Sequence, residues 1–400
     1  MGVTASSARR GATTALLYCH DTFGLGHLRR TLSLVEALHE RRPDVSLLIA
    51  TGSPLAHAFR LPHRVDYLKL PSVEKVGAAY AARSLPLPLK EVTALRTDIL
   101  AAAARRVRPD LVVVDNVPAG LGGELLPALR ELRRSGRTRL VLGLRDIVDE
   151  PERVRRAWTR DGSYGLLDDV YDRILVYGQP DVFDVVAEYR FSRAAQTKTR
   201  YVGYFRRLRP AVRQRGGRPL VLVTAGGGGD GFSLLRTALE SRTQACLTEA
   251  SWVVVSGPFM PPHEQAELMK LARCLPDTQL VEFASDLPAL IASADVVVSM
   301  GGYNSVCEIL SARRRAVIVP RVEPRLEQLL RARALERRGL VRVVHPDDLT
   351  PTQLQLHIEA LLATAASNRE DVDLSGLVGA TAELESLLDA AEPLAAGGAR

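Results

Sequence analysis

The chain has 400 residues, a formal net charge of +7 and 46% hydrophobic residues. The chain is too long to pack around one ordinary hydrophobic core, so we predict two domains. The composition excludes a largely disordered chain. The basic clusters fall in predicted helices without interleaved aromatic residues, so we expect no nucleic-acid partner.

The cysteine content and the apolar segments bear on localisation. The four cysteines form no CxxC pair, which is typical of a reducing compartment. The N-terminal apolar run, 15–19, is too short for a signal sequence, and no run reaches the roughly 20 residues that span a bilayer. We therefore expect a cytoplasmic protein. The stretch 76–107 mixes apolar and basic residues, so peripheral contact with the inner membrane face is an alternative to ordinary core packing.

Short runs rich in Val, Ile and Leu alternate with segments of helical periodicity. Continuous apolar runs of this kind predict parallel strands that are buried on both faces of a sheet. We therefore expect two doubly wound α/β domains. The predicted strands of the first domain are 15–19, 45–50, 111–115, 139–144 and 173–178, and those of the second are 219–225, 252–256, 279–283, 295–299 and 316–320.

The stretch 206–219 has no apolar periodicity and contains two prolines, so 206–218 is the predicted linker. The N-terminal domain is then 1–205 and the C-terminal domain 219–376. The amphipathic segment 377–391 predicts a helix that packs back across the domain junction, and 392–400 a disordered tail.

The loop after the first predicted strand reads CHDTFGLGHLRR, from Cys19 to Arg30. Gly24 and Gly26 allow close backbone approach, and His27 falls in the first turn of the next helix. A dinucleotide fingerprint fails because Arg29 replaces its third glycine. An ordinary turn between strand and helix explains the glycines equally well.

Two further glycine-rich loops follow strands in the second half. The loop GGGGDG, 226–231, predicts a backbone nest for an anion, but a Walker P-loop is excluded because GK[ST] is absent. In SMGGYNSVCEIL, 299–310, Asn304 or Ser305 can cap the following helix. Glu308 lies about one turn later, near enough to accept both hydroxyls of a ribose, although a surface helix residue is the alternative interpretation.

These motifs resemble a known family. Residues 220 to about 343 resemble the donor domain of glycosyltransferase family 28, which includes the lipid II-forming N-acetylglucosaminyltransferase and the galactolipid synthases. The resemblance rests on the glycine-rich loop, EFxxD at 282–286, ADVVVS, GGxxSxxE and the closing Glu327-Gln328 pair. The N-terminal half resembles bacterial predicted glycosyltransferases that carry HDTFGLGHLRR. The resemblance implies a GT-B fold, two facing Rossmann-like domains with a cleft between them.

The family also implies roles for individual residues. Phe283 and Ala284 would frame the base, and Glu308 would hold the ribose. Gln328, with Glu327 beside it, would lie near the sugar or ribose, and Arg206 or Arg207 would help neutralise phosphate. The residues expected near the diphosphate or elsewhere in the donor site are Gly24, Gly26, Gly227, Gly228, Gly229, Gly301, Gly302, Asn304 and Ser305. The implied substrate is a nucleotide sugar, with UDP favoured by the family, and no cofactor is implied.

An inverting transfer needs a base for the acceptor hydroxyl and positive electrostatics for the leaving diphosphate. His27 is the first candidate base. Asp115 either acts as base or orients His27, and Asp21 is a third candidate. Structural interpretations stay open, because Asp115 can cap a turn and His27 can bind phosphate. We expect no metal site, since a strict DxD occurs only at 371–373, away from any predicted strand end.

The sequence therefore predicts an inverting, metal-independent hexosyl- or N-acetylhexosaminyltransferase. Its partners would be a nucleotide-sugar donor and a small-molecule, glycan or lipid-linked acceptor. A nucleotide-sugar 2-epimerase of similar architecture and a noncatalytic nucleotide-sugar-binding subunit are the alternatives.

Overall fold

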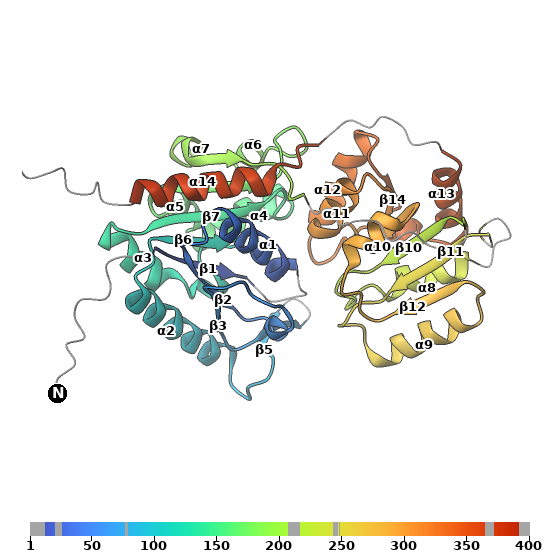
Figure 1. Cartoon of the computed structure of the whole chain (residues 1–400), viewed down its shortest axis with the longest axis horizontal. Coiled ribbons are helices and arrows are strands. Elements are labelled where there is room, and N and C mark those ends of the chain that lie inside the picture. Colours follow the sequence, from blue (N-terminus) through green and yellow to red (C-terminus); the bar gives the residue numbers. More distant parts are fainter. Residues whose placement is uncertain are drawn as a thin grey trace, which may run out of the picture.

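The computed structural model describes residues 13–20, 26–76, 79–206, 217–242, 247, 249–364 and 372–391. These residues form two lobes side by side, each built around its own sheet (Figure 1). We call the lobe around the first sheet the N-terminal domain and the other the C-terminal domain.

The sheet of the N-terminal domain has seven strands in the order β3-β2-β1-β6-β7-β8-β9, and every neighbouring pair is parallel. The strands are β1 (Thr14–Cys19), β2 (Ser46–Thr51), β3 (Val65–Lys69), β6 (Leu111–Asp115), β7 (Arg139–Arg145), β8 (Arg173–Tyr177) and β9 (Thr199–Tyr201). A separate antiparallel hairpin is formed by β4 (Val73–Val76) and β5 (Ala79–Ala82).

Helices cover both faces of this sheet (Figure 1). They are α1 (Gly26–Arg41), α2 (Leu89–Val107), α3 (Leu126–Ser135), α4 (Pro151–Asp161), α5 (Ser163–Asp169), α6 (Val185–Glu188) and α7 (Arg193–Lys198). The helix α1 buries Leu28, Leu32, Val35 and Leu38, which recur at the three- and four-residue spacing of one helix face.

The sheet of the C-terminal domain has six parallel strands in the order β12-β11-β10-β13-β14-β15. They are β10 (Leu220–Thr224), β11 (Ser251–Val255), β12 (Thr278–Val281), β13 (Val296–Ser299), β14 (Arg315–Ile318) and β15 (Arg342–Val343). The helices are α8 (Phe232–Ser241), α9 (Pro262–Arg273), α10 (Leu287–Ser293), α11 (Tyr303–Ser311), α12 (Glu327–Arg337) and α13 (Pro351–Ala363).

The last helix, α14 (Gly376–Ala391), returns to the N-terminal domain and lies along its sheet beside α1 (Figure 1). Arg41 and Arg42 at the end of α1 pair with Glu385 and Asp389 of α14, at 2.6 and 2.8 Å. Just before α14, the chain forms a hydrogen bond with the segment that follows β9. The Tyr204 N–H donates to the Asp373 carbonyl at 2.7 Å. The chain therefore crosses between the domains twice, and the two crossings lie side by side.

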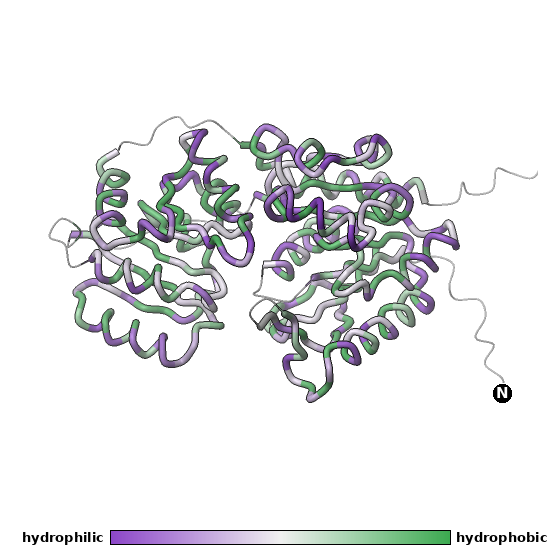
Figure 2. Tube along the Cα trace, turned by 180° about the vertical axis from the view of Figure 1, so that it is seen from behind, coloured by the Kyte–Doolittle hydropathy of each residue, from purple (hydrophilic) through white to green (hydrophobic). Residues whose placement is uncertain are grey.

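The predicted doubly wound α/β architecture is confirmed, and each of the ten predicted strands is present within a few residues of its expected bounds. The hairpin strands β4 and β5 were not predicted, and neither were three strands of the two main sheets, β3, β9 and β15. These three lie at sheet edges and are short or partly exposed, so they lack the continuous apolar run of a central strand. Figure 2 shows the hydrophobic strand segments inside both lobes and hydrophilic segments on the outer helices.

The strand order determines where a ligand can bind. In each sheet the order reverses beside a central strand, between β1 and β6 in the first sheet and between β10 and β13 in the second. Loops leave such a point in opposite directions and open a crevice at the carboxyl ends of the strands. The loops after β1, β6, β10 and β13 are therefore expected to line the site, and they carry the glycine and histidine motifs of the sequence.

A buried ion pair joins the two domains. The Arg331 guanidinium, from α12, donates to both carboxylate oxygens of Asp146, which follows β7, with Nε–Oδ2 and Nη2–Oδ1 distances of 2.8 and 2.7 Å. Both side chains are almost fully buried. The Tyr204 hydroxyl and the Ile147 N–H also donate to Asp146, so each carboxylate oxygen accepts two hydrogen bonds. Nearby, Arg145 pairs with Glu327 across the same junction at 2.7 Å.

Replacing Arg331 by alanine leaves the Asp146 carboxylate buried without its counter-charge. Removing one partner of a buried pair costs about 3–5 kcal/mol, so we expect Arg331→Ala to lower the free energy of unfolding by about that amount in urea titrations. The matched control is Arg338→Ala, which breaks the solvent-exposed interdomain pair with Asp181. That loss should stay below about 1 kcal/mol. Equal losses in the two variants would show that the buried pair has no special role.

Candidate functional site

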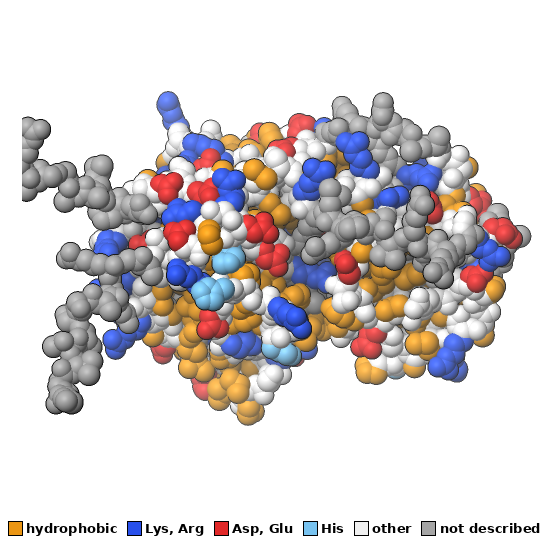
Figure 3. Space-filling view, viewed as in Figure 1, with side chains coloured by type: hydrophobic (Ala, Val, Ile, Leu, Met, Phe, Trp, Pro, Cys, Tyr) orange, Lys and Arg blue, Asp and Glu red, His pale blue; other side chains and the backbone are white. Residues whose placement is uncertain are grey.

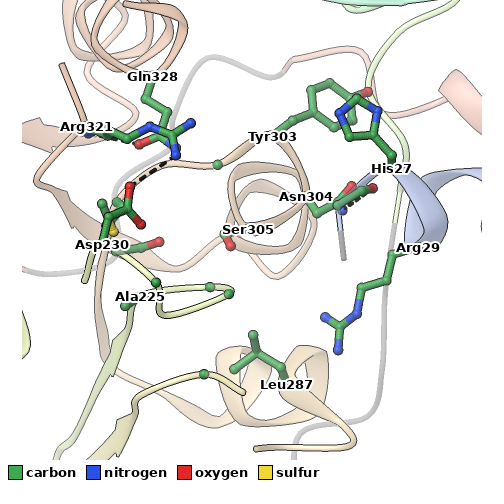
Figure 4. A pocket seen from close by; sticks show the side chains of 18 of the residues that line it. His27, Arg29, Ala225, Asp230, Leu287, Tyr303, Asn304, Ser305, Arg321 and Gln328 are labelled. Atoms are coloured by element: carbon green, nitrogen blue, oxygen red, sulfur yellow. Dashed lines mark hydrogen bonds and ion pairs between the residues drawn. The ribbon is translucent and has the colours of Figure 1, made fainter. Parts of the chain in front are cut away.

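A cleft of about 430 Å³ lies between the domains, where the carboxyl ends of both sheets face each other. Figure 4 shows His27 and Arg29 of α1 on one side of it and residues of the C-terminal domain on the other. The N-terminal wall consists of His20, Gly26, His27, Arg29, Arg30, Tyr80 and Arg145. The opposite wall comes from the glycine-rich loop after β10, the segment 282–287, the start of α11 and the segment 321–328.

His27 and Asp115 form a hydrogen-bonded pair at the N-terminal wall. The Nδ1 atom of His27 lies 2.5 Å from Oδ2 of Asp115. The other carboxylate oxygen, Oδ1, accepts from Nε and Nη2 of Arg30 at 3.0 and 2.6 Å. Asp115 ends β6 and is buried behind His27. This geometry fits Asp115 as the group that orients His27, rather than as a base that reaches a substrate itself.

The charges around the pair determine its protonation. Burial alone would raise the pKa of the Asp115 carboxyl, but the cations of Arg30 and His27 hold that pKa well below its usual range. Burial lowers the pKa of His27 below 6.5, with Arg30 and Arg145 acting in the same direction and Asp115 opposing them. Near neutral pH the pair is thus an ionised carboxylate beside a neutral imidazole. The carboxylate takes the Nδ1 proton as a hydrogen bond, which leaves Nε2 as the basic nitrogen.

A second histidine lies beside this pair. His20, directly after β1, lines the cleft and contacts the His27 ring edge to face, with ring centroids 5.6 Å apart. Burial, and then the proximity of His27, lower the pKa of His20 well below its ordinary value. The sequence analysis did not select His20. The rule that favoured Asp115, a polar residue at the carboxyl end of a strand, would have found it.

The glycine-rich loop divides into residues that face the cleft and one that does not. Gly227 and Gly229 line the cleft, as does Gly226. Gly228 was expected near the diphosphate, but it packs against the loop after β11 instead. A Cβ added there would lie 2.2 Å from the Ser256 carbonyl oxygen, and the φ of Gly228 is +91°. Gly228 is therefore glycine because of the loop's own packing.

The start of α11 differs from the prediction in two respects. Gly302 is the N-cap residue and no side chain caps the helix. The Asn304 amide instead reaches across the cleft and donates to the Gly26 carbonyl at 2.9 Å. Gly301 does not line the cleft, since its φ is +74° and a Cβ there would meet Ile318 at 2.6 Å. Ser305 and the buried Glu308 do line it, so Glu308 is not a surface helix residue.

The remaining predicted donor residues lie mainly where expected. Phe283 and Ala284 line the cleft, with the Phe283 side chain 47% exposed. Gln328 also lines it, and its Oε1 atom accepts from the Arg321 N–H at 2.9 Å. Glu327 faces the cleft but is paired with Arg145. Burial would raise the pKa of Glu327, and the Arg145 cation keeps it below its usual range.

Some predicted residues are not part of this site. Arg206 is exposed and is absent from the cleft walls, because the chain is already crossing between the domains at that point. Asp21, Gly24 and Arg207 lie outside the described residues, as do most of the predicted linker and the tail 392–400.

Several arginines of the site were missed. Arg30 fixes the Asp115 carboxylate, and Arg145 and Arg321 line the cleft beside Glu327. Arg321 also pairs with Asp230 of the glycine-rich loop at 3.1 Å, as Figure 4 shows. Arg145 and Asp146 directly follow the predicted strand 139–144, so the strand-end rule would have indicated them. In a chain so rich in arginine, composition alone gave no reason to single them out.

Known proteins resemble this chain in sequence. Residues 220–383 match the glycosyltransferase family 28 C-terminal domain. The chain is 28% identical over 298 residues to UDP-N-acetylglucosamine--N-acetylmuramyl-(pentapeptide) pyrophosphoryl-undecaprenol N-acetylglucosamine transferase of Rubrobacter xylanophilus, 72% of this chain and 76% of the relative. The enzyme of the same name from Geobacillus kaustophilus is 33% identical over 105 residues, which cover 26% of this chain and only 29% of that relative.

A solved structure shows the same fold. The calicheamicin glycosyltransferase CalG4 superposes with a TM-score of 0.62 at 18% identity, over 95% of this chain and all of that one. The predicted GT-B fold, two facing Rossmann-like domains with a cleft between them, is therefore confirmed. The match of residues 220–383 also confirms the predicted resemblance of the C-terminal half to glycosyltransferase family 28.

In the described residues, none of the helices has the length and hydrophobicity that crossing a lipid bilayer requires.

The protonation of His27 can be measured directly. We expect ¹³C NMR titration of the eight histidines, with His27→Gln to assign the resonance, to give a pKa for His27 below 6.5. In Asp115→Asn the pKa of His27 should fall further, because the carboxylate raises it and Arg30 then acts unopposed. A pKa above 6.5, or a rise in the Asp115→Asn variant, would contradict the arrangement described above.

Proposed function

We propose that the chain transfers a sugar from a UDP-sugar to an acceptor hydroxyl with inversion at the anomeric carbon. One observation carries the proposal. The His27–Asp115 pair of the N-terminal domain faces, across one cleft, the glycine-rich loop and the first turn of α11 in the family 28 domain. A base and an anion-binding surface are thus held on opposite walls of the same space.

In the proposed reaction, Nε2 of His27 takes the proton of the acceptor hydroxyl. The hydroxyl oxygen forms a bond to the anomeric carbon from the face opposite the leaving group. The bond from that carbon to the phosphate oxygen breaks, and its electron pair leaves on the UDP. Asp115 keeps the Nδ1 proton in place and stabilises the imidazolium that forms. Arg30 holds the carboxylate in the orientation this requires.

The developing charge on UDP needs positive groups near the diphosphate. Free N–H groups at the start of α11, its positive dipole end and the N–H groups of Gly227 and Gly229 would supply them. Arg321 lines the same region and adds a cation. These groups support our proposal that the transfer proceeds without a metal ion.

The relatives' names guide the choice of substrates. The transferases of Rubrobacter and Geobacillus are named for UDP-N-acetylglucosamine and a pyrophosphoryl-undecaprenol acceptor. We propose a UDP-linked hexose or N-acetylhexosamine as donor here, with Phe283 and Ala284 at the base and Glu308 at the ribose. A lipid-linked acceptor is our proposal for the other substrate.

An apolar surface supports a lipid-linked acceptor. Leu85 and Leu87 are exposed in the loop between β5 and α2, and Leu95 is exposed on α2. The cationic side chains of Arg83 and Lys90 flank the loop. Figure 3 shows hydrophobic side chains gathered at the lower edge of the N-terminal lobe, where Figure 1 places β5 and α2. Such a surface suits peripheral contact with an anionic membrane.

The two alternatives predict different products. A 2-epimerase would isomerise the nucleotide sugar without an acceptor and would need further acid and base carboxylates in the cleft. Of the cleft carboxylates, Glu327 is paired with Arg145 and Asp230 with Arg321, which disfavours both of these as free proton carriers. A noncatalytic subunit would have no use for the oriented His27–Asp115 pair.

Calorimetric titration tests the donor site. We expect UDP to bind in preference to ADP, GDP, TDP and NAD, and Glu308→Ala to weaken UDP binding by about tenfold to a hundredfold. The reason is that a hydrogen bond to a charged group contributes about 1.5–3 kcal/mol. Glu267→Ala, an exposed change on α9 remote from the cleft, is the control and should bind UDP as the parent does. Binding of NAD alone, or UDP affinity indifferent to Glu308, would overturn the donor-site assignment.

Vesicle cosedimentation tests the membrane surface. We expect the chain to sediment with vesicles that contain phosphatidylglycerol, and the double variant Leu85→Ser/Leu87→Ser to lose most of that binding at about 0.1 M salt. The control Leu356→Ser removes an equally exposed leucine from α13 of the other domain and should not change binding. Equal sedimentation of all three proteins would exclude this surface.

A further inference from the structure

The first turn of α11 contacts both sides of the cleft. Gly302 and Ser305 face the space between the domains. Between them in the sequence, Tyr303 and Asn304 also line the cleft and in addition contact the N-terminal domain. The sequence reads Gly-Tyr-Asn-Ser from 302 to 305, so four consecutive residues bring the proposed diphosphate site and the N-terminal wall together.

Asn304 holds the backbone next to His27. Its Nδ2 atom donates to the carbonyl of Gly26, the first residue of α1, at 2.9 Å. The two residues are 278 positions apart in the sequence, and their hydrogen bond joins the two domains. Because Gly26 directly precedes His27, the bond restrains the backbone that carries the imidazole.

The Tyr303 ring contacts both arginines that bind the buried carboxylates. Its ring centroid is 5.5 Å from the Arg30 guanidinium carbon and 5.7 Å from that of Arg331. Arg30 binds Asp115, the partner of His27, and Arg331 binds Asp146 at the domain junction. A desolvated cation over an aromatic face is attracted to it, and Tyr303 is buried. The ring thus connects the interdomain ion pair to the His27–Asp115 pair.

We propose that Tyr303 and Asn304 are positioning residues, through which the C-terminal domain holds the base of the N-terminal domain in its reactive orientation. The proposal rests on the proposed transferase function. It implies that a nucleotide bound at the start of α11 also fixes the base, so that donor binding and base placement occur together.

The groups that surround His27 set the direction of the effect. They are Asp115 from β6, Arg30 from the same helix, His20 after β1 and Arg145 after β7. Arg30 and burial both lower the pKa of His27, and Asp115 raises it. If the Tyr303 ring is removed, the Arg30 guanidinium loses its contact with the ring, and water enters the space beside His27 and Arg30. The pKa of His27 should then rise.

The test compares Tyr303→Leu, Tyr303→Phe and Asn304→Ala in the full chain. Asn304 was expected in the donor site, but its amide is engaged by the Gly26 carbonyl of the other domain. We therefore expect Asn304→Ala, like Tyr303→Leu, to bind UDP as the parent does. The kcat for hydrolysis of UDP-N-acetylglucosamine should fall by about 10²-fold, the effect of misplacing a catalytic group by about 1 Å, while KM for the donor is unchanged. In Tyr303→Leu, the pKa of His27 measured by NMR should move upward.

The conservative variant separates positioning from a general loss of structure. The Tyr303 hydroxyl is buried and makes no hydrogen bond with the described residues. Tyr303→Phe therefore keeps the ring in contact with the two arginines and should restore both the rate and the pKa of His27 that Tyr303→Leu loses. Arg338→Ala, which breaks the interdomain pair with the exposed Asp181, is the control and should match the parent.

The outcomes distinguish the two proposals. If the parent chain does not bind UDP, the proposed function fails. If UDP binds normally while Tyr303→Leu and Asn304→Ala keep the parent's rate and the parent's His27 pKa, the positioning role alone is wrong. Should Tyr303→Leu not fold, Asn304→Ala decides the question through kcat at constant KM. A loss of UDP affinity equal to the loss of rate would also overturn the positioning role.

Discussion

The buried ion pair between Asp146 and Arg331 fixes the relation of the two domains, on which the whole site depends. Neither wall of the cleft forms the site alone, because the His27–Asp115 pair belongs to one domain and the glycine-rich loop to the other. A buried pair is sensitive to geometry because its attraction offsets desolvation only when the hydrogen bonds are well formed. Here Asp146 receives four donors, so the docked arrangement is well defined.

From this junction a continuous series of contacts reaches the proposed base. Arg331 and Arg30 both lie over the ring of Tyr303, and Arg30 binds Asp115 beside His27. Each arginine of the series binds a buried carboxylate, Asp146 at one end and Asp115 at the other, and the Tyr303 ring separates the two cations. The result at the end of the series is a neutral imidazole against an ionised carboxylate, which is the protonation state a general base needs.

The two domains differ in how closely they follow known proteins. The C-terminal domain matches the family model from its first strand into α14. The agreement in position of Phe283, Ser305, Glu308 and Gln328 on one wall is consistent with a shared way of holding a nucleotide sugar. The exposed leucines of the loop between β5 and α2 and the arginines of the cleft wall lie in the N-terminal domain, outside the matched range.

The sequence by itself determined the architecture and the local motifs. Continuous apolar runs predicted both parallel sheets, and the loops after β1, β10 and β13 were correctly expected to line a site, because buried parallel strands and glycine-rich turns are encoded locally. Tertiary structure decided which residues meet. Whether Gly228 and Gly301 face a ligand or pack, whether Asn304 caps its helix or bridges the domains, and which of many arginines pair with Asp115, Asp146 and Glu327 depend on contacts between segments far apart in the chain. No local pattern specifies those contacts, since they form only when the two sheets dock.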